Sequence, residues 1–143
     1  MSHILKHYTY SELNVGHQAS FEVKVTAELQ QKFLEISGDI SPLHTDSDFA
    51  KSKGFAGPVV YGMLTASFYS TLVGTYLPGA HCLFYESDIK FRQPVFIDDI
   101  LLVTGTVTDK HDGFKRLSIK AVIRNQHGQT VSSATLKVGV THE

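Results

Sequence analysis

A stretch of sixteen residues without one charged side chain constrains this chain more than any other feature. Residues 61–76 read YGMLTASFYSTLVGTY, and their side chains offer no polar face beyond hydroxyls. An uncharged helix of this kind is typical of a helix that protein surrounds. A membrane span takes roughly twenty apolar residues, and Leu77-Pro78-Gly79 ends this stretch before that length. We therefore expect a buried helix at the centre of the fold.

Apolar and polar residues alternate along five runs of the chain. These runs are residues 19–25, 83–91, 101–108, 114–124 and 129–140. Alternation with a period of two is typical of half-buried strands, and Asp112-Gly113 supplies turn chemistry between two of the runs. A sheet and an uncharged helix each need the apolar face that the other offers. The sequence thus predicts an α+β fold, in which a curved antiparallel sheet of about five to six strands wraps around the long central helix.

A second helix is predicted to begin after Thr26 and to run to about Ser37. The Thr26 hydroxyl can cap its first turn, and Gly38 stands where a helix C-terminus commonly needs a left-handed residue. A polar loop is expected over residues 39–46, and residues 47–53 can add one or two helical turns.

The composition fits one globular domain and excludes several functions. The 143 residues are 42% apolar, and no repeat or linker divides residues 1–143, so we expect a single domain. Basic and acidic residues are interspersed and give a net charge of −1, without the basic block that binds nucleic acid. The lone Cys82 cannot form an intramolecular disulfide and lacks the neighbours of a zinc site. We expect it to be a buried, inert thiol.

No targeting or membrane segment is visible in the sequence. The first twenty residues contain no signal-peptide core, and no apolar run is long enough to span a bilayer. We expect a cytoplasmic protein in a reducing setting, with no membrane partner. Four histidines are assigned to the surface, namely His3, His7, His81 and His142.

Asp39 and His44 form the most informative pair in the chain. They lie five residues apart in a loop that Pro42 stiffens, so their side chains can converge on one point. A carboxylate beside an imidazole is suited to general acid–base catalysis, because imidazole titrates near neutral pH. The alternative is that Asp39 only caps a helix or a turn and that His44 is an ordinary surface residue.

The segment GPVVYGML, residues 57–64, leads directly into the central helix. Backbone N–H groups are unpaired at a helix start, and Gly62 permits close approach, so this segment can bind a carbonyl oxygen that gains negative charge. The alternative is that Gly57 and Pro58 only make a turn and that Gly62 only packs against a strand. The helix hydroxyls are expected to bond backbone carbonyls. They belong to Thr65, Ser67, Ser70 and Thr71.

Three segments resemble those of a known family and occur in the same order. Residues 33–46, FLEISGDISPLHTD, followed by Ala50, resemble the hydratase-2 signature of the MaoC-like dehydratases, the (R)-specific enoyl-CoA hydratases. Residues 61–64, YGML, and residues 91–95, FRQPV, are similar to two further family segments. The resemblance covers nearly the whole chain, and its first motif is the specific one.

The resemblance implies a hot-dog fold, a sheet wrapped around a long central helix, usually in homodimers with sites near the subunit contact. It implies that Asp39 and His44 hold a water and act as the acid–base pair. It also implies that Gly62 donates its backbone N–H to the carbonyl of a thioester. Ser70 falls where the family often has a serine close to the site.

Two residues depart from the family pattern. Ser41 stands where the signature most often has Asn, and Tyr61 stands where many members have His before the glycine. Ser41 keeps a hydroxyl donor but lacks the reach of an amide. Because Tyr61 is also bulkier than His, we expect turnover rate and substrate shape to be affected more than the acid–base pair.

The combined prediction is an enzyme that reversibly hydrates a trans-2-enoyl thioester to an (R)-3-hydroxyacyl thioester, without a metal or a redox cofactor. The thioester carrier is either coenzyme A or an acyl carrier protein. Two alternatives remain, an acyl-CoA thioesterase and a non-catalytic module that binds acyl thioesters. Phe68, Tyr69 and Leu72 either shape an acyl pocket or simply pack beneath the sheet.

Overall fold

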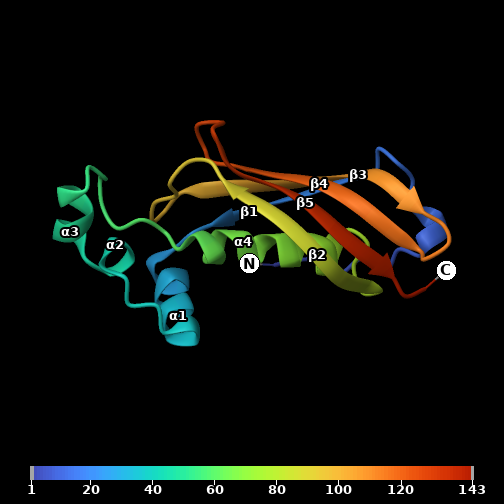
Figure 1. Cartoon of the computed structure of the whole chain (residues 1–143), viewed down its shortest axis with the longest axis horizontal. Helices are drawn as coiled ribbons and strands as arrows, with labels where there is room; N and C mark the ends of the chain where they lie inside the picture. The colour runs from blue at the N-terminus through green and yellow to red at the C-terminus, as the bar shows by residue number, and fades with distance from the viewer. Residues whose placement is uncertain (1, 143) are drawn as a thin grey trace.

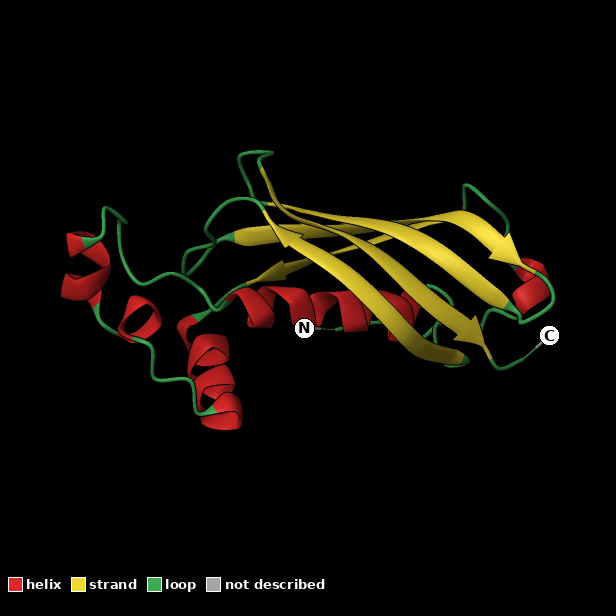
Figure 2. Cartoon of the chain, in the orientation of Figure 1, coloured by secondary structure: helices red, strands yellow, loops and turns green. Residues whose placement is uncertain are grey.

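The computed structural model of the chain describes residues 2–142. Its helical elements are η1 (Tyr10–Glu12), α1 (Ala27–Ser37), α2 (Pro42–Thr45), α3 (Ser47–Ser52), α4 (Gly62–Thr71) and the π-helical turn η2 (Leu72–Tyr76). Its strands are β1 (Gln18–Lys24), β2 (Cys82–Phe91), β3 (Ile100–His111), β4 (Arg116–Arg124) and β5 (Thr130–Val140). The sheet lies over α4, while α1, α2 and α3 project beyond one end of it (Figure 1, Figure 2).

The strands form one antiparallel sheet in the order β1-β3-β4-β5-β2. β3, β4 and β5 follow one another as a meander, and β1 and β2 pair with its two outer strands to become the edges. Alternate residues of the inner strands are buried in the core, as Val103, Ile119 and Leu136 show. The five predicted strands are confirmed. The curved antiparallel sheet over a helix is the hot-dog arrangement that the resemblance implied.

The central helix, formed by α4 and η2, is present, but only one of its sides is covered. Leu64, Phe68 and Leu72 are buried in the core on that side. An uncovered stripe runs along the other side, where Met63 is 60% exposed. The stripe consists of Met63, Ser67, Ser70 and Gly74. The expectation of protein on every side is wrong for the single chain, because one sheet covers only one side of a helix.

The far end of the central helix packs very closely against the sheet. Leu72, Val73 and Leu77 are at most 1% exposed there. A Cβ atom added to Gly105 of β3 would lie 2.7 Å from Cδ2 of Leu72, so glycine is needed for this close approach.

The segment between β1 and α4 folds into three short helices. The Thr26 hydroxyl accepts the N–H of Leu29 at the start of α1, and Gly38 has a φ of +69° at its end, which confirms both predicted caps. The expected loop over residues 39–46 is helical in part, because Pro42 begins the single turn of α2. The predicted turns that follow are α3.

The lone thiol and the four histidines assigned to the surface differ in exposure. Cys82 is half-buried, and burial raises the pKa of its thiol to about 11, in agreement with an inert group. His7 and His142 are exposed as predicted, but His3 and His81 are half-buried, and His3 Nδ1 lies 2.6 Å from the Tyr76 hydroxyl. Within residues 2–142, no helix is long and apolar enough to cross a membrane.

Candidate active site

Asp39 lies just beyond the end of α1, where the backbone turns toward α2. Its Oδ1 accepts the backbone N–H of Ser41 at 3.0 Å, so this contact does not depend on the side chain at position 41. The residue is exposed, and its other carboxylate oxygen, Oδ2, has no hydrogen-bond partner among the described residues. Asp39 therefore keeps one oxygen available for a water or a ligand.

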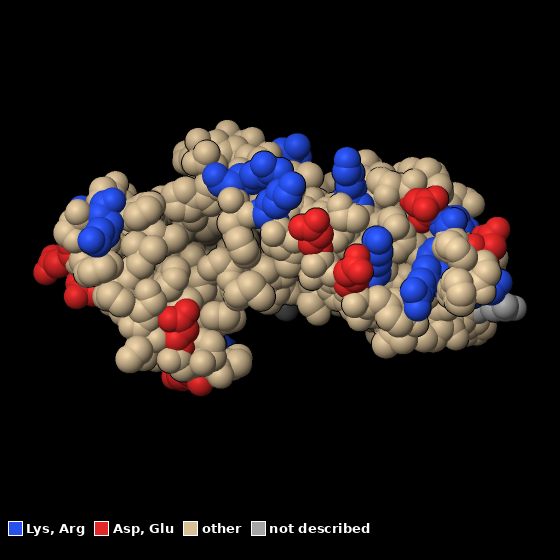
Figure 3. Space-filling view, viewed as in Figure 1, with Lys and Arg blue, Asp and Glu red and all other residues tan. Residues whose placement is uncertain are grey.

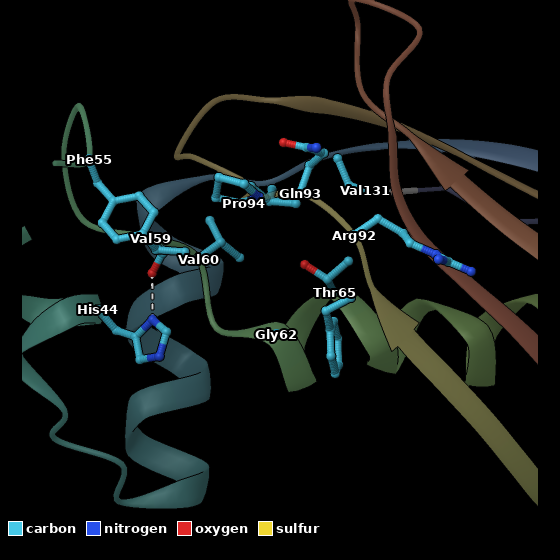
Figure 4. A pocket seen from close by; sticks show the side chains of 12 residues that line it. His44, Phe55, Val59, Val60, Gly62, Thr65, Arg92, Gln93, Pro94 and Val131 are labelled. Atoms are coloured by element: carbon cyan, nitrogen blue, oxygen red, sulfur yellow. Dashed lines mark hydrogen bonds between the residues drawn. The ribbon is translucent and has the colours of Figure 1, made fainter. Parts of the chain in front are cut away.

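His44 lies on α2, and a hydrogen bond fixes its imidazole from one side. Nδ1 lies 2.6 Å from the carbonyl oxygen of Val59 (Figure 4). Because a carbonyl oxygen only accepts hydrogen bonds, Nδ1 carries a proton and donates it. In the neutral ring, the lone pair is then on Nε2. The imidazole is thus oriented with a basic nitrogen on the side away from Val59.

Gln30 of α1 holds the segments on which this geometry depends. Its side chain is buried, and its Nε2 donates to the carbonyl oxygens of His44, at 3.2 Å, and Val59, at 3.1 Å. Its Oε1 accepts the N–H of Tyr61 at 3.2 Å. Sequence reasoning missed Gln30. The available signal was an amide between apolar helix positions, but its partners lie fourteen to thirty-one residues away.

Tyr61 packs its ring against the imidazole of His44. Its ring centroid is 4.3 Å from that of His44, and its hydroxyl donates to the carbonyl oxygen of Asp39. Burial, together with the negative charge of Asp39, raises the pKa of Tyr61, which keeps this hydroxyl protonated as a donor. Tyr61, which stands where many family members have His, therefore contacts both Asp39 and His44.

Gly62 begins α4 and brings a backbone donor to the same place. The N–H groups of Gly62 and Met63 have no partner among the described residues, as is usual in the first turn of a helix. A Cβ atom on Gly62 would lie 3.2 Å from Cε1 of Phe91, so the missing side chain leaves room for that ring. The start of α4 can thus donate a hydrogen bond to a carbonyl oxygen.

One hollow joins the groups that the sequence singled out. It has a volume of about 350 Å³, and Asp39, His44, Tyr61 and Gly62 all line it. A neighbouring cavity of about 300 Å³ shares His44, Gly62 and Phe91 with this hollow and extends between α4 and the sheet. The lining of this hollow therefore brings a carboxylate, an imidazole and the start of a helix to one space.

Other candidate residues lie elsewhere. Ser70 is exposed two turns along α4 and lines neither the hollow nor the cavity. Phe68, Tyr69 and Leu72 are buried in the core, which agrees with packing beneath the sheet. In the part of the chain that the structure describes, no three His, Cys, Asp or Glu side chains gather as a metal site requires.

Basic side chains gather beside the cavity, over the end of β2 (Figure 3). Lys90, Arg92 and Lys120 line a second hollow of about 410 Å³, and Arg92 also lines the cavity. Across the described residues, none of the three lies within 4 Å of a carboxylate oxygen, although Asp88 lines the same hollow.

Comparisons with known proteins show which family the chain resembles. The chain matches the model of the MaoC-like domain over residues 12–134. It is 36% identical over 96 residues to the (R)-specific enoyl-CoA hydratase of Aeromonas caviae, covering 67% of this chain and 72% of the relative. It is 32% identical over 105 residues to the enzyme of that name from Rhodospirillum rubrum, covering 73% and 72%.

Solved structures give the same result. The unliganded R-hydratase PhaJ1 of Pseudomonas aeruginosa has a TM-score of 0.91 and 27% identity, covering 97% of this chain and 89% of that one. The (R)-hydratase of A. caviae involved in PHA biosynthesis has a TM-score of 0.86 and 30% identity, covering 90% and 97%. The fold, the hollow and these likenesses lead to one conclusion: the chain belongs to the MaoC-like domain family.

Proposed function

We propose that this protein is an (R)-specific enoyl-thioester hydratase, which adds water reversibly to a trans-2-enoyl thioester. The observation that carries the proposal is the hollow that Asp39, His44 and Gly62 line together. The names of the relatives from A. caviae and R. rubrum support the same activity. No metal or redox cofactor takes part in the reaction as we propose it.

The reaction begins with the thioester carbonyl oxygen at the N–H of Gly62. That hydrogen bond strengthens as negative charge develops on the oxygen, which lowers the barrier to attack at C3. Asp39 orients a water through its free Oδ2, and His44 accepts a proton from that water through Nε2. The water oxygen bonds to C3, and His44 transfers the proton that it accepted to C2, so both side chains end the cycle in their starting protonation states.

The test is the hydration of crotonyl-CoA by Asp39→Asn and His44→Ala. Each variant is expected to fold but to lose about 10²–10⁴-fold in kcat, the usual contribution of positioned proton transfer. Asp48→Asn and His127→Ala, at exposed positions outside the hollow, serve as matched controls and should keep the normal rate. Wild-type turnover in either site variant would contradict the assignment.

The same assay separates the two alternative functions. A thioesterase would release free CoA thiol from a saturated acyl-CoA, because water would attack the carbonyl carbon and not C3. A non-catalytic binding module would bind acyl thioesters of several chain lengths tightly and turn over none of them.

Coenzyme A is the carrier that we propose for the substrate. Lys90, Arg92 and Lys120 lie in a hollow that adjoins the cavity, where cations can bind the phosphates at the end of a pantetheine arm. Lys120→Ala should raise the KM for crotonyl-CoA several-fold but leave crotonyl-pantetheine, which lacks the nucleotide phosphates, unaffected. A stronger effect on a crotonyl acyl carrier protein would reverse this choice.

A second copy of the chain is the partner that we propose. Two surfaces support this proposal: the uncharged stripe on the central helix and the edge strand β2, where Leu83 is 48% exposed. Surfaces of this kind are typically buried against another protein. Light scattering should give the mass of a homodimer or a larger homo-oligomer. Leu83→Lys should weaken the assembly, whereas Leu102→Lys, at 38% exposure on the inner strand β3, should not.

We also propose a cytoplasmic location. It is supported by the lone Cys82, which suits a reducing compartment. Fractionation of cells that express the tagged protein tests this location.

A further inference from the structure

One buried hydroxyl in this molecule has no partner. Thr65 is 2% exposed, and its Oγ1 makes no hydrogen bond within the described residues. Buried polar groups are nearly always paired, because an unpaired one loses its contacts with water and gains nothing in return. Such a group therefore points to a partner that is not part of the folded chain.

The helix does not pair this hydroxyl. A helical threonine usually bonds the carbonyl four residues earlier, which here belongs to Tyr61. That carbonyl oxygen already accepts the N–H groups of Leu64, at 3.0 Å, and Thr65, at 3.1 Å. Ser67, two residues further along the helix, does bond the helix backbone, because its hydroxyl donates to the carbonyl of Leu64, three residues earlier, at 2.6 Å.

The hydroxyl points into the cavity beside the candidate active site. Figure 4 shows it directed into the space bounded by Val60, Pro94 and Val131. Those walls are apolar. Of the polar side chains that line the cavity, Arg92 and Gln93 are exposed and His44 is half-buried, whereas Thr65 is buried.

Thr65 is also close to the place where the thioester carbonyl binds. Side chains of a helix tilt toward its N-terminus, so the Thr65 hydroxyl lies over the turn that Gly62 begins. Three residues advance a helix by about 4.5 Å, a distance that a few carbon–carbon bonds span. A ligand atom that meets Thr65 is therefore a few bonds away from the carbonyl.

We propose that Thr65 makes this site selective for acyl thioesters that carry a hydroxyl or oxo group at the fourth or fifth carbon. The inference rests on the proposed hydratase function and adds the class of acyl chain. A plain alkyl chain in the cavity leaves the Thr65 hydroxyl unpaired, whereas an oxygen on the chain pairs it. We expect a preference of roughly tenfold to a hundredfold in kcat/KM for the oxygenated chain.

The experiment compares kcat/KM for 4-hydroxycrotonyl-CoA and crotonyl-CoA in four proteins. The wild type and Thr65→Ser should prefer the hydroxylated substrate, and Thr65→Val, which has the same shape without the hydroxyl, should lose that preference. Ser67→Ala is the matched control on the same helix, because its hydroxyl bonds the chain itself, and its ratio should equal that of the wild type. An unchanged ratio in Thr65→Val would overturn the proposal.

Two further measurements keep the proposal apart from the hydratase function. Calorimetric affinities for 4-hydroxybutyryl-CoA and butyryl-CoA should show the same dependence on Thr65, even if no hydration occurred. The melting temperature of Thr65→Val should equal or exceed that of the wild type, because removing an unpaired buried hydroxyl removes a cost. A lower melting temperature would show that the hydroxyl already has a partner in the protein, which also contradicts the proposal.

Discussion

The two ends of the central helix are built differently. At η2, Leu72 and Val73 are almost completely buried, and β3 comes so close that Gly105 has no room for a side chain. At the start of α4, the N–H of Gly62 and the hydroxyl of Thr65 have no partner among the described residues, and a hollow and a cavity meet there. Packing at one end stabilises the fold, and the open end retains polar groups for a ligand.

The two ends also differ in how they are held. Apolar contacts, which have no preferred direction, hold η2 beneath the sheet. Hydrogen bonds from Gln30, which do have a direction, hold His44, Val59 and Tyr61 at the open end. Directional contacts suit a site in which one ring nitrogen must face the substrate.

A substitution at the packed end should have the largest effect, and it should change the stability of the protein but not its activity. Leu72→Ala removes a completely buried side chain and leaves a cavity, which lowers the free energy of unfolding by about 2–5 kcal/mol. Urea titration measures this loss. The kcat of the folded fraction should stay normal, and a loss of kcat without a loss of stability would break the comparison between the two ends.

The open end should show the reverse pattern. Gly62→Val places a branched side chain against Phe91 and beside the free N–H, so kcat/KM for crotonyl-CoA should fall by about 10²-fold, as when an oxyanion donor is lost. The control is Gly57→Val, because a Cβ at that position meets no atom within 4 Å. Equal kinetics in the two variants would remove Gly62 from the reaction.

A substitution at Gln30 sharpens the comparison between the two ends, because it should lower both stability and activity. Gln30→Leu keeps the side-chain volume but leaves buried backbone groups unpaired, which costs about 1–3 kcal/mol of stability. The backbone segments that carry His44 and its Val59 partner also lose this support, so kcat should fall. The exposed neighbour serves as control in Gln31→Leu, where neither change is expected.

Alkaline pH should have the smallest effect, and it should act on the packed end. Burial raises the pKa of Tyr69 from 10.0 to about 12 and that of Cys82 from 9.0 to about 11. The unfolded chain loses these protons first, so stability is complete below pH 9 and declines as the pH rises toward 12. Denaturant midpoints across this range measure the decline, which should be shallower in Tyr69→Phe.

Local signals in the sequence were sufficient for most of the fold. The uncharged helix, the alternating strands and the caps at Thr26 and Gly38 all depend on neighbours within a few residues. The exposed side of α4 could not be predicted. An uncharged helix has the same composition whether its own chain or a second copy of the chain covers it. The turn of α2 was missed because Pro42 suits a loop and a first helical turn equally well.

The sequence singled out Asp39, His44 and Gly62, and the structure places all three along one hollow. Their catalytic and binding roles stay predictions. Gln30 was not found, because its partners lie far from it in the sequence. Thr65 was expected to bond a helix carbonyl, but its hydroxyl makes no hydrogen bond among the described residues, and the Tyr61 carbonyl four residues earlier accepts two backbone N–H groups.

The order of the strands sets the order in which the protein can assemble during synthesis. β1 leaves the ribosome early, yet its partner β3 follows only after all of α1 to α4 and β2. Pairings so distant in the chain form slowly. Until β3, β4 and β5 emerge, the uncharged helix α4 has no sheet to cover it, and its apolar side is exposed to aggregation. A nascent chain with this topology is expected to depend on chaperones until its final third has been translated.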